Sequence, residues 1–281
     1  MTQVQSGVIW MIIATFSFSF MGMFVKFGGP FFSEVELVFY RSFVSLIIIL
    51  MLIQNKKISL RTKHKKLHFF RSFIGFLSLI AFFYAISHLP LSTAISLNYT
   101  SPLFVALLIP FFLNKKPSPK IYCMLLVGFF GTFLILKPIL YGNSIFAGSV
   151  GLLSGFGAGL AYLYMAQLGK VNEPEIRVVF YFTFLSSICA GFLMIFEDIN
   201  VDIFKHFWIL LGLGISATVA QLALTKAYKV GNTLKNAGLS YLTIFFSSVL
   251  GLIIFSESLD SMSIVGILFI ITSGIIVSKK N

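Results

Sequence analysis

Ten apolar stretches follow one another along this chain, separated by short polar connections. A helix needs about 20 apolar residues to cross the hydrocarbon core of a bilayer. Helices are expected because lipid offers no partner for unpaired backbone groups. The sequence therefore predicts an all-α integral membrane protein with ten transmembrane helices, at residues 7–27, 34–53, 69–88, 92–113, 120–137, 147–169, 175–196, 206–229, 233–256 and 261–278.

The composition of the chain is typical of an integral membrane protein. Only 11% of its residues are charged and its mean hydropathy is +0.96, whereas soluble domains carry about 25% charged residues. The net charge of +12 lies in short runs between apolar stretches, which argues against nucleic acid as a partner. Cys123 and Cys189 both fall inside apolar stretches, with no metal-binding spacing. We therefore expect a small molecule and membrane lipids as partners, and no metal or cofactor.

The distribution of Lys and Arg predicts the orientation. Of the 21 basic residues, 17 fall in the even-numbered connections and at the C-terminus, and Arg71 is counted with the second connection. Three fall in the odd-numbered connections, and Arg41 lies within the second span. Basic residues accumulate on the cytoplasmic side of a membrane. We therefore expect a multi-pass protein of the inner (plasma) membrane with both termini in the cytoplasm.

The chain carries an internal duplication at an offset near 140 residues. FYRSFVS at 39–45 matches FYFTFLS at 180–186, and LNYTSPLF at 97–104 matches LSYLTIFF at 239–246. These matches occur in order and predict two five-helix repeats, 1–140 and 141–281. Because five is odd, the second repeat enters the membrane from the other face. Inverted repeats are a recurrent transporter architecture, with the substrate site near the midplane.

The chain resembles the EamA-type drug/metabolite transporter superfamily over nearly its whole length. The resemblance rests on VFYRSFVSL around Arg41, on FRSFIG around Arg71 and on the stretch 84–113, and in the second half on Tyr241 and Glu257. It implies ten helices in two inverted repeats that move amino acids, nucleotides and related metabolites by alternating access. Some similar members take up S-adenosylmethionine. The resemblance differs at 114–116, where Asn-Lys-Lys stands in place of the family's Glu.

A proline interrupts the fourth span. Pro102 removes a backbone donor and clashes with the preceding turn, and such breaks persist where they are buried in protein or line a wet cavity. We predict a hinge at Pro102, with Asn98, Tyr99 and Ser101 as substrate-binding candidates, although a simple packed kink is the alternative. The matching residue in the ninth span is Ile244, which predicts no symmetric kink. Tyr241 matches Tyr99 and is a further candidate.

Polar stripes mark two other spans. Thr15, Ser19, Gly22 and Lys26 follow one face of the first span, and the eighth span carries a similar stripe that includes Thr218, Gln221 and Tyr228. A polar stripe on a spanning helix faces protein or water. Hydrogen bonding between helices and contact with substrate remain alternatives for these residues. Gln167 is a further substrate-binding candidate.

Arg41 is the most costly residue to place in the bilayer. It lies about seven residues, or roughly 10 Å, into the second span. An intramembrane Arg is a candidate site residue, but we favour structural pairing with Glu34, Glu36 or a helix C-terminus. Snorkelling to the headgroups is the other alternative.

The expected activity is secondary transport of a small organic metabolite. No Asp or Glu lies deep in a span, which favours exchange or facilitated diffusion over a carboxylate proton relay. A membrane-embedded enzyme is less favoured because no nucleophile, metal or phosphate-binding motif is found. An exporter of drugs or toxic metabolites and a channel remain alternatives. The protein is expected to be a monomer or a weak dimer.

Overall fold

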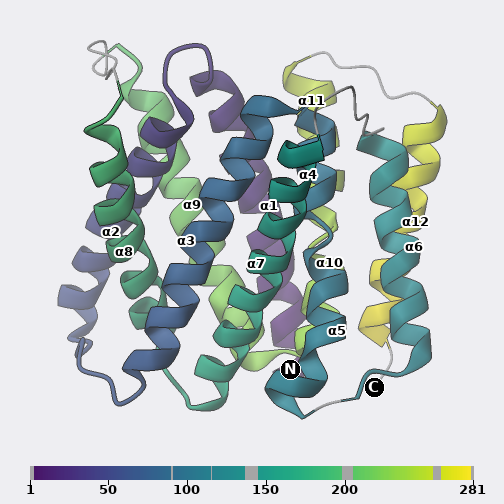
Figure 1. The fold of residues 1–281 in the computed structure, drawn as a ribbon. Helices are drawn as coiled ribbons and strands as arrows, with labels where there is room; N and C mark the ends of the chain where they lie inside the picture. The colour runs from purple at the N-terminus through teal and green to yellow at the C-terminus, as the bar shows by residue number, and fades with distance from the viewer. Residues whose placement is uncertain are drawn as a thin grey trace.

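The computed structural model describes residues 3–89, 91–114, 116–136, 145–197, 205–255 and 261–279, and every regular element among them is a helix (Figure 1). Eight stretches are long and apolar enough to cross a membrane, and two shorter apolar helices start at Pro119 and Ser261. The helices are α1 (Gln3–Gly28), α2 (Glu34–Lys56), α3 (Lys65–His88), α4 (Leu91–Asn98), α5 (Ser101–Leu113), α6 (Pro119–Leu136), α7 (Ile145–Lys170), α8 (Glu175–Met194), α9 (Phe207–Val230), α10 (Thr233–Leu239), α11 (Leu242–Ile254) and α12 (Ser261–Lys279).

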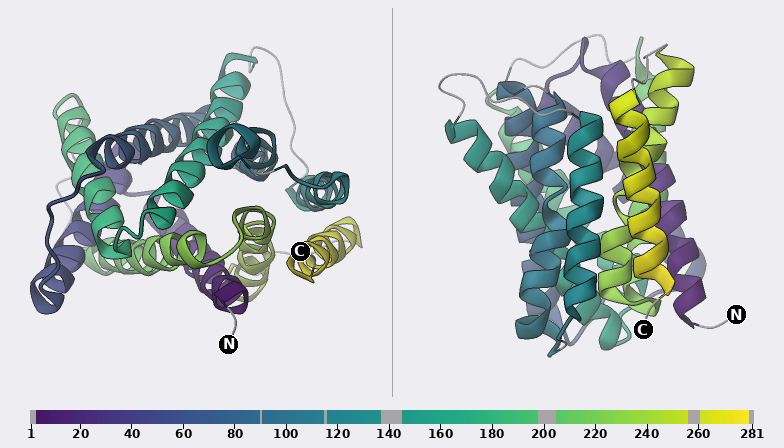
Figure 2. Two further views of the ribbon diagram at one scale, coloured as in Figure 1. Left: turned by 90° about the horizontal axis from the view of Figure 1, so that it is seen from below. Right: turned by 90° about the vertical axis from the view of Figure 1, so that its right-hand side faces the viewer.

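The two halves of the chain interleave. α1 packs on α9, α3 packs on α7, and α2 packs on α8. α6 and α12 pair at one edge of the bundle (Figure 2). Helices of one half therefore bury their inner faces against helices of the other half, which makes one helical bundle out of the two repeats.

Corresponding helices of the two halves run in opposite directions. Both termini lie at the lower end of the bundle in Figure 1, where α1 begins and α7 ends. The connections that follow α2, α5, α7 and α9 lie at this end too. We call it the basic end, because these connections, the helix ends next to them and the C-terminus together carry most of the Lys and Arg residues. The other end is called the opposite end.

Local signals fix the ends of α2, which carries Arg41. Ser33 and Glu36 form a reciprocal capping box at its start, an arrangement that satisfies two otherwise unpaired backbone donors. Lys57 ends the helix in the left-handed conformation, with φ of 50°. The register of Arg41 within the membrane is therefore set by its own helix ends.

The fourth and the ninth spans are both broken, although a break was predicted in the fourth span alone. α4 ends at Asn98 and α5 begins at Ser101, with Pro102 in its first turn, where its missing donor costs least. The ninth span breaks at Ser240 and Tyr241 without a proline. There the Tyr241 amide donates to the carbonyl of Gly238 at 3.4 Å, three residues back instead of four. The ninth span is therefore broken by a local change from i→i−4 to i→i−3 backbone hydrogen bonds, and not by a proline.

The broken fourth span packs against the glycines of α7. A Cβ atom on Gly155 would lie 2.5 Å from the carbonyl oxygen of Leu97, and one on Gly159 would lie 3.1 Å from that of Ser101. Glycine allows the two backbones this close approach. The predicted repeat boundary at 140 and 141 lies outside the described residues, as does Glu257.

Candidate functional site

Two arginines are buried in the bundle. Arg41 of α2 is 4% exposed and Arg71 of α3 is 3% exposed. Counting Arg71 among the residues of a polar connection was wrong, because α3 begins at Lys65 and Arg71 lies about 9 Å further along the helix. Burying a charge is expensive unless it is paired. The two guanidinium groups are therefore the most unusual feature of this interior.

The arginines from the first half meet groups from the second half. Arg71 donates through Nη2 to Oε1 of Gln221 on α9 at 3.0 Å, and its guanidinium lies 3.9 Å from the ring centre of Phe182 on α8. The Arg41 guanidinium lies 5.9 Å from the same ring, and its Nε donates to the sulfur of Met21 at 3.3 Å. Phe182 matches Arg41 at the repeat offset. The aromatic face attracts both cations.

Neither arginine pairs with a carboxylate among the described residues. The predicted pairing of Arg41 with Glu34 or Glu36 is therefore wrong, and the alternative of snorkelling is excluded because the side chain is buried. Glu36 is used in the cap of α2. For Arg71, both Nε and Nη1 are buried without a hydrogen-bond partner. The site thus carries uncompensated positive charge.

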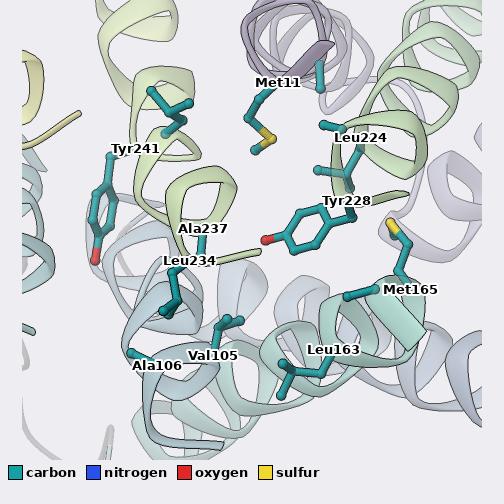
Figure 3. Close-up of a cluster of buried hydrophobic side chains, with 14 of the residues drawn as sticks. Met11, Val105, Ala106, Leu163, Met165, Leu224, Tyr228, Leu234, Ala237 and Tyr241 are labelled. Atoms are coloured by element: carbon teal, nitrogen blue, oxygen red, sulfur yellow. The ribbon is translucent and has the colours of Figure 1, made fainter. Parts of the chain in front are cut away.

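Two tyrosines complete the arrangement from α7 and α9. The rings of Tyr162 and Tyr228 lie 5.4 Å apart, and Tyr162 interacts electrostatically with both arginines. Figure 3 shows Tyr228 pointing into the middle of the buried cluster. Its hydroxyl is buried without a hydrogen-bond partner.

The structure does not bring Tyr99 and Tyr241 around the arginines. Tyr241 is fully buried, and its hydroxyl faces the carbonyl of Leu125 on α6 at 3.4 Å. It lies well apart from Tyr228 in Figure 3. The Tyr99 side chain interacts with Thr243 of α11, which links the two broken spans.

The remaining candidates occupy three environments, and only Gln221 contacts an arginine. Thr15 and Ser19 are buried and donate to carbonyls of their own helix, whereas Gly22 and Lys26 of the same predicted stripe are exposed. The other candidates join helices or lie buried at the break: Thr218 donates to Ser45, Asn98 to Ser154 and Gln167 to the carbonyl of Phe112, while Ser101 is buried.

The packing of equivalent helix pairs differs between the two ends. α7 packs on α9, whereas the equivalent helices α1 and α3 make no comparable contact within the described residues. α5 packs on α10, and the equivalent pair α4 and α11 again lacks such contact in the described parts of the chain. Ala166 is 3% exposed, but its equivalent Gly22 is exposed. The bundle is therefore closed at the basic end and looser at the opposite end.

An ion network covers the basic end near Arg71. Glu173, between α7 and α8, accepts a hydrogen bond from Thr62 and pairs with Arg177 at 2.7 Å. Nε2 of His68, one turn before Arg71 on α3, lies 3.3 Å from the same carboxylate. Burial raises the pKa of Glu173, but the hydrogen bonds from Thr62 and Arg177 outweigh this and lower its pKa below 4.5. The network ties the α2–α3 connection of one half to the α7–α8 connection of the other.

Comparison with known proteins identifies the family. The model of the EamA-like transporter family matches twice, at residues 5–137 and 145–279. The chain belongs to the EamA-like transporter family. The fold agrees with that of a solved crystal structure, with a TM-score of 0.86 and 15% identity over 98% of this chain and 97% of that one.

Several relatives of this EamA-like transporter are named as transporters. The pseudopaline exporter CntI of Pseudomonas aeruginosa is 30% identical over 276 residues, which cover 98% of this chain and 97% of that protein. An uncharacterized transporter of Helicobacter pylori is 31% identical, with 97% and 94% covered. An S-adenosylmethionine uptake transporter of Rickettsia bellii is 25% identical, with 98% and 94% covered. The protein is therefore a multi-pass membrane transporter for a small molecule.

Lowering the pH should abolish the contribution of Glu173 to the stability of the transporter. Because the folded-state pKa of Glu173 is lowered, its contribution is complete above pH 4.5 and is lost as the pH falls through that pKa. We expect Glu173→Gln to cost about 1–2 kcal/mol at pH 7. The gap in thermal midpoint between parent and variant should close towards pH 3. A gap independent of pH would contradict this assignment, and Arg177→Gln should add little to Glu173→Gln.

The sequence contained a signal that Arg71 lies within a span, but the prediction of orientation counted this residue with the second connection. The predicted span 69–88 already included this residue, and FRSFIG was among the motifs of the family resemblance. Phe182 and Tyr162 had no comparable signal. The chain contains 34 Phe and 10 Tyr residues, so residue type alone cannot distinguish a ring at the site from one that faces lipid.

Proposed function

We propose that this EamA-like transporter is a secondary transporter that moves a small organic metabolite across the inner membrane by alternating access. The proposed topology has ten crossings, in which α4 with α5 and α10 with α11 each form one broken span. The basic end faces the cytoplasm, because positively charged connections are retained on that side. Both termini are then cytoplasmic, and 1–140 and 141–281 are the two repeats.

The unequal packing of equivalent helix pairs carries this proposal. Two similar repeats that run in opposite directions have two equivalent arrangements, and each arrangement closes one end. α7 and α9 are packed at the basic end, while the described residues of α1 and α3 make no comparable contact at the opposite end. The present conformation is the one closed to the cytoplasm. Exchange of these contacts between the repeats would produce the other conformation.

The two broken spans are the proposed hinges. Pro102 lies just beyond the first break, and Tyr99 and Tyr241 lie at equivalent positions of the two breaks. Hinges are short segments that absorb changes in backbone angles. In this proposal, the role of Asn98, Ser101 and Tyr99 is to hold the α4–α5 break against α7 and α11. Thr15, Ser19, Thr218 and Gln167 join or stiffen the moving helices, and Gln221 orients Arg71.

The proposed substrate is a metabolite and not a bulk ion. The names of the relatives, a pseudopaline exporter and an S-adenosylmethionine uptake transporter, support an organic substrate that carries charged groups. An amino acid or a nucleotide-like compound fits the same description. The relatives include an exporter and an importer by name, so export of toxic metabolites is the second candidate function.

Counterflow in proteoliposomes tests the proposal. Vesicles preloaded with a candidate metabolite should accumulate the labelled compound transiently, with saturation, and without an imposed ion gradient. A channel would show no counterflow and no saturation. Labelling of single cysteines at the two termini and at Lys57 should place all three on the cytoplasmic side, and termini on different sides would refute the topology.

A further inference from the structure

We infer that Arg41 and Arg71 form an anion-binding site whose ligand is an organic substrate with a carboxylate group. The inference rests on the proposed transport function and specifies the substrate class of the same protein. Its basis is the juxtaposition of two buried arginines at one aromatic ring, without a carboxylate partner among the described residues and with Nε and Nη1 of Arg71 unpaired.

The charge of the site demands a counterion. A buried arginine that lacks an acidic partner keeps an uncompensated charge, and this costs several kcal/mol in a low-dielectric interior. Here two such charges lie close enough to interact with each other. Aromatic contact with Phe182 offsets part of this cost. A bound anion would neutralise the remaining positive charge, so binding of an anion at this place is favourable.

The free donors match a carboxylate. Nε and Nη1 of Arg71 have no hydrogen-bond partner. Arg presents its N–H groups in forks that bind the two oxygens of a carboxylate. Gln221 accepts one of the two N–H groups of Nη2, so a fork remains, made by the second N–H of Nη2 with Nε or with Nη1. A phosphate has three acceptor oxygens and more charge, and would need more donors than these.

The rings around the arginines set the character of the rest of the ligand. Phe182 and Tyr162 come from two helices of the second half, while both arginines come from the first half. Aromatic faces accept an apolar or planar body. The ligand is thus a carboxylate attached to an aliphatic or aromatic body, held between the two repeats. A ligand in this place contacts both halves and senses their relative movement.

The first test compares matched ligands at constant ionic strength. Purified transporter in detergent is heated with phenylacetate or phenylacetamide, with N-acetylphenylalanine or its amide, with succinate or succinamide, and with inorganic phosphate. At least one carboxylate should raise the thermal midpoint by a few degrees while its amide does not. Arg71→Lys, which keeps the charge but loses the fork, should weaken the apparent affinity about tenfold or more. Equal protection by acid and amide, protection by phosphate alone, or no protection by any probe would overturn the inference.

A second test needs no ligand. If the arginines serve a substrate and not the fold, Arg71→Met should leave the thermal midpoint of the empty protein unchanged or raise it, because an unpaired buried charge is removed. Arg41→Met should behave in the same way. A loss of many degrees in both variants would show that the arginines are structural and would refute the site.

The outcomes separate this inference from the proposed function. Counterflow of a neutral or cationic metabolite that is unaffected by Arg71→Gln would refute the anion site but keep the transporter. Protection by carboxylates that depends on Arg71, without counterflow of the same compound, would keep the site but refute secondary transport.

Discussion

Replacing Gly155 with leucine should prevent the transporter from folding. A Cβ atom at this position would lie 2.5 Å from the carbonyl oxygen of Leu97 and 3.1 Å from that of Asn98. Both neighbours are backbone atoms at the α4–α5 break, so no side-chain movement can relieve the overlap. Overpacking that moves backbone costs about 3 kcal/mol or more, a large part of the 5–15 kcal/mol that stabilises a typical protein. We expect little monodisperse protein after extraction, measured by fluorescence-detected size exclusion.

A matched substitution on the same helix provides the control. Ser149 is exposed on α7, and its hydroxyl donates to the carbonyl of Ile145 in its own helix. Ser149→Leu adds a similar bulk towards lipid and should leave the yield and the thermal midpoint close to those of the parent. Equal yields of Ser149→Leu and Gly155→Leu would show that α7 does not pack on the break as described.

Replacing Gly169 with leucine should leave a folded protein that transports poorly. A Cβ atom on Gly169 would lie 2.7 Å from Cα of Lys229, where α7 meets α9 at the basic end. The clash penalises the conformation closed at this end by about 1–3 kcal/mol, which shifts its population about tenfold to a hundredfold. Because transport must pass through this conformation, we expect counterflow to fall about tenfold or more.

A cysteine reporter distinguishes this shift from unfolding. In a Cys123→Ser, Cys189→Ser background, Ala166→Cys is buried at the closed end. Gly169→Leu should accelerate its labelling by a maleimide. Gly22→Leu should also reduce counterflow. Position 22 is the equivalent of position 166, so it must become enclosed when the opposite end closes. It should not accelerate labelling at position 166. Unchanged labelling in Gly169→Leu would contradict closure by α7 and α9.

Much of the architecture was predictable from the order of residues alone. The matches between 39–45 and 180–186 predicted two repeats, and the family model matches the chain twice. Among the described residues, eight apolar stretches long enough to cross a membrane and two shorter apolar helices lie within the predicted spans. Two of these stretches, Ala94–Leu113 and Thr233–Phe255, are each broken into two helices. The break at Ser240 and Tyr241 was missed because it depends on local bonding and has no proline to mark it.

The site was predicted less well. Gln221 was identified from its place in a polar stripe, and it contacts Arg71. Arg41 was identified by its cost in lipid, but its predicted ion pair is absent from the described residues. Tyr99 and Tyr241 were selected for equivalent positions in the two repeats, yet a repeat relation does not show which way a side chain points. Tyr241 turns to α6, while Tyr228 points into the cluster.

The order of residues was enough to predict which segments are apolar enough to cross a membrane, which end of the bundle is basic, and that the chain is duplicated. These properties depend on the composition of each segment, because transfer into lipid acts on each helix separately. Only the tertiary structure decided which faces turn inward, that Arg41 and Arg71 meet over Phe182, and which end is closed. The physical reason is that lipid is as apolar as the helix interfaces, so hydrophobic periodicity does not distinguish the inner face of a membrane helix from its outer face.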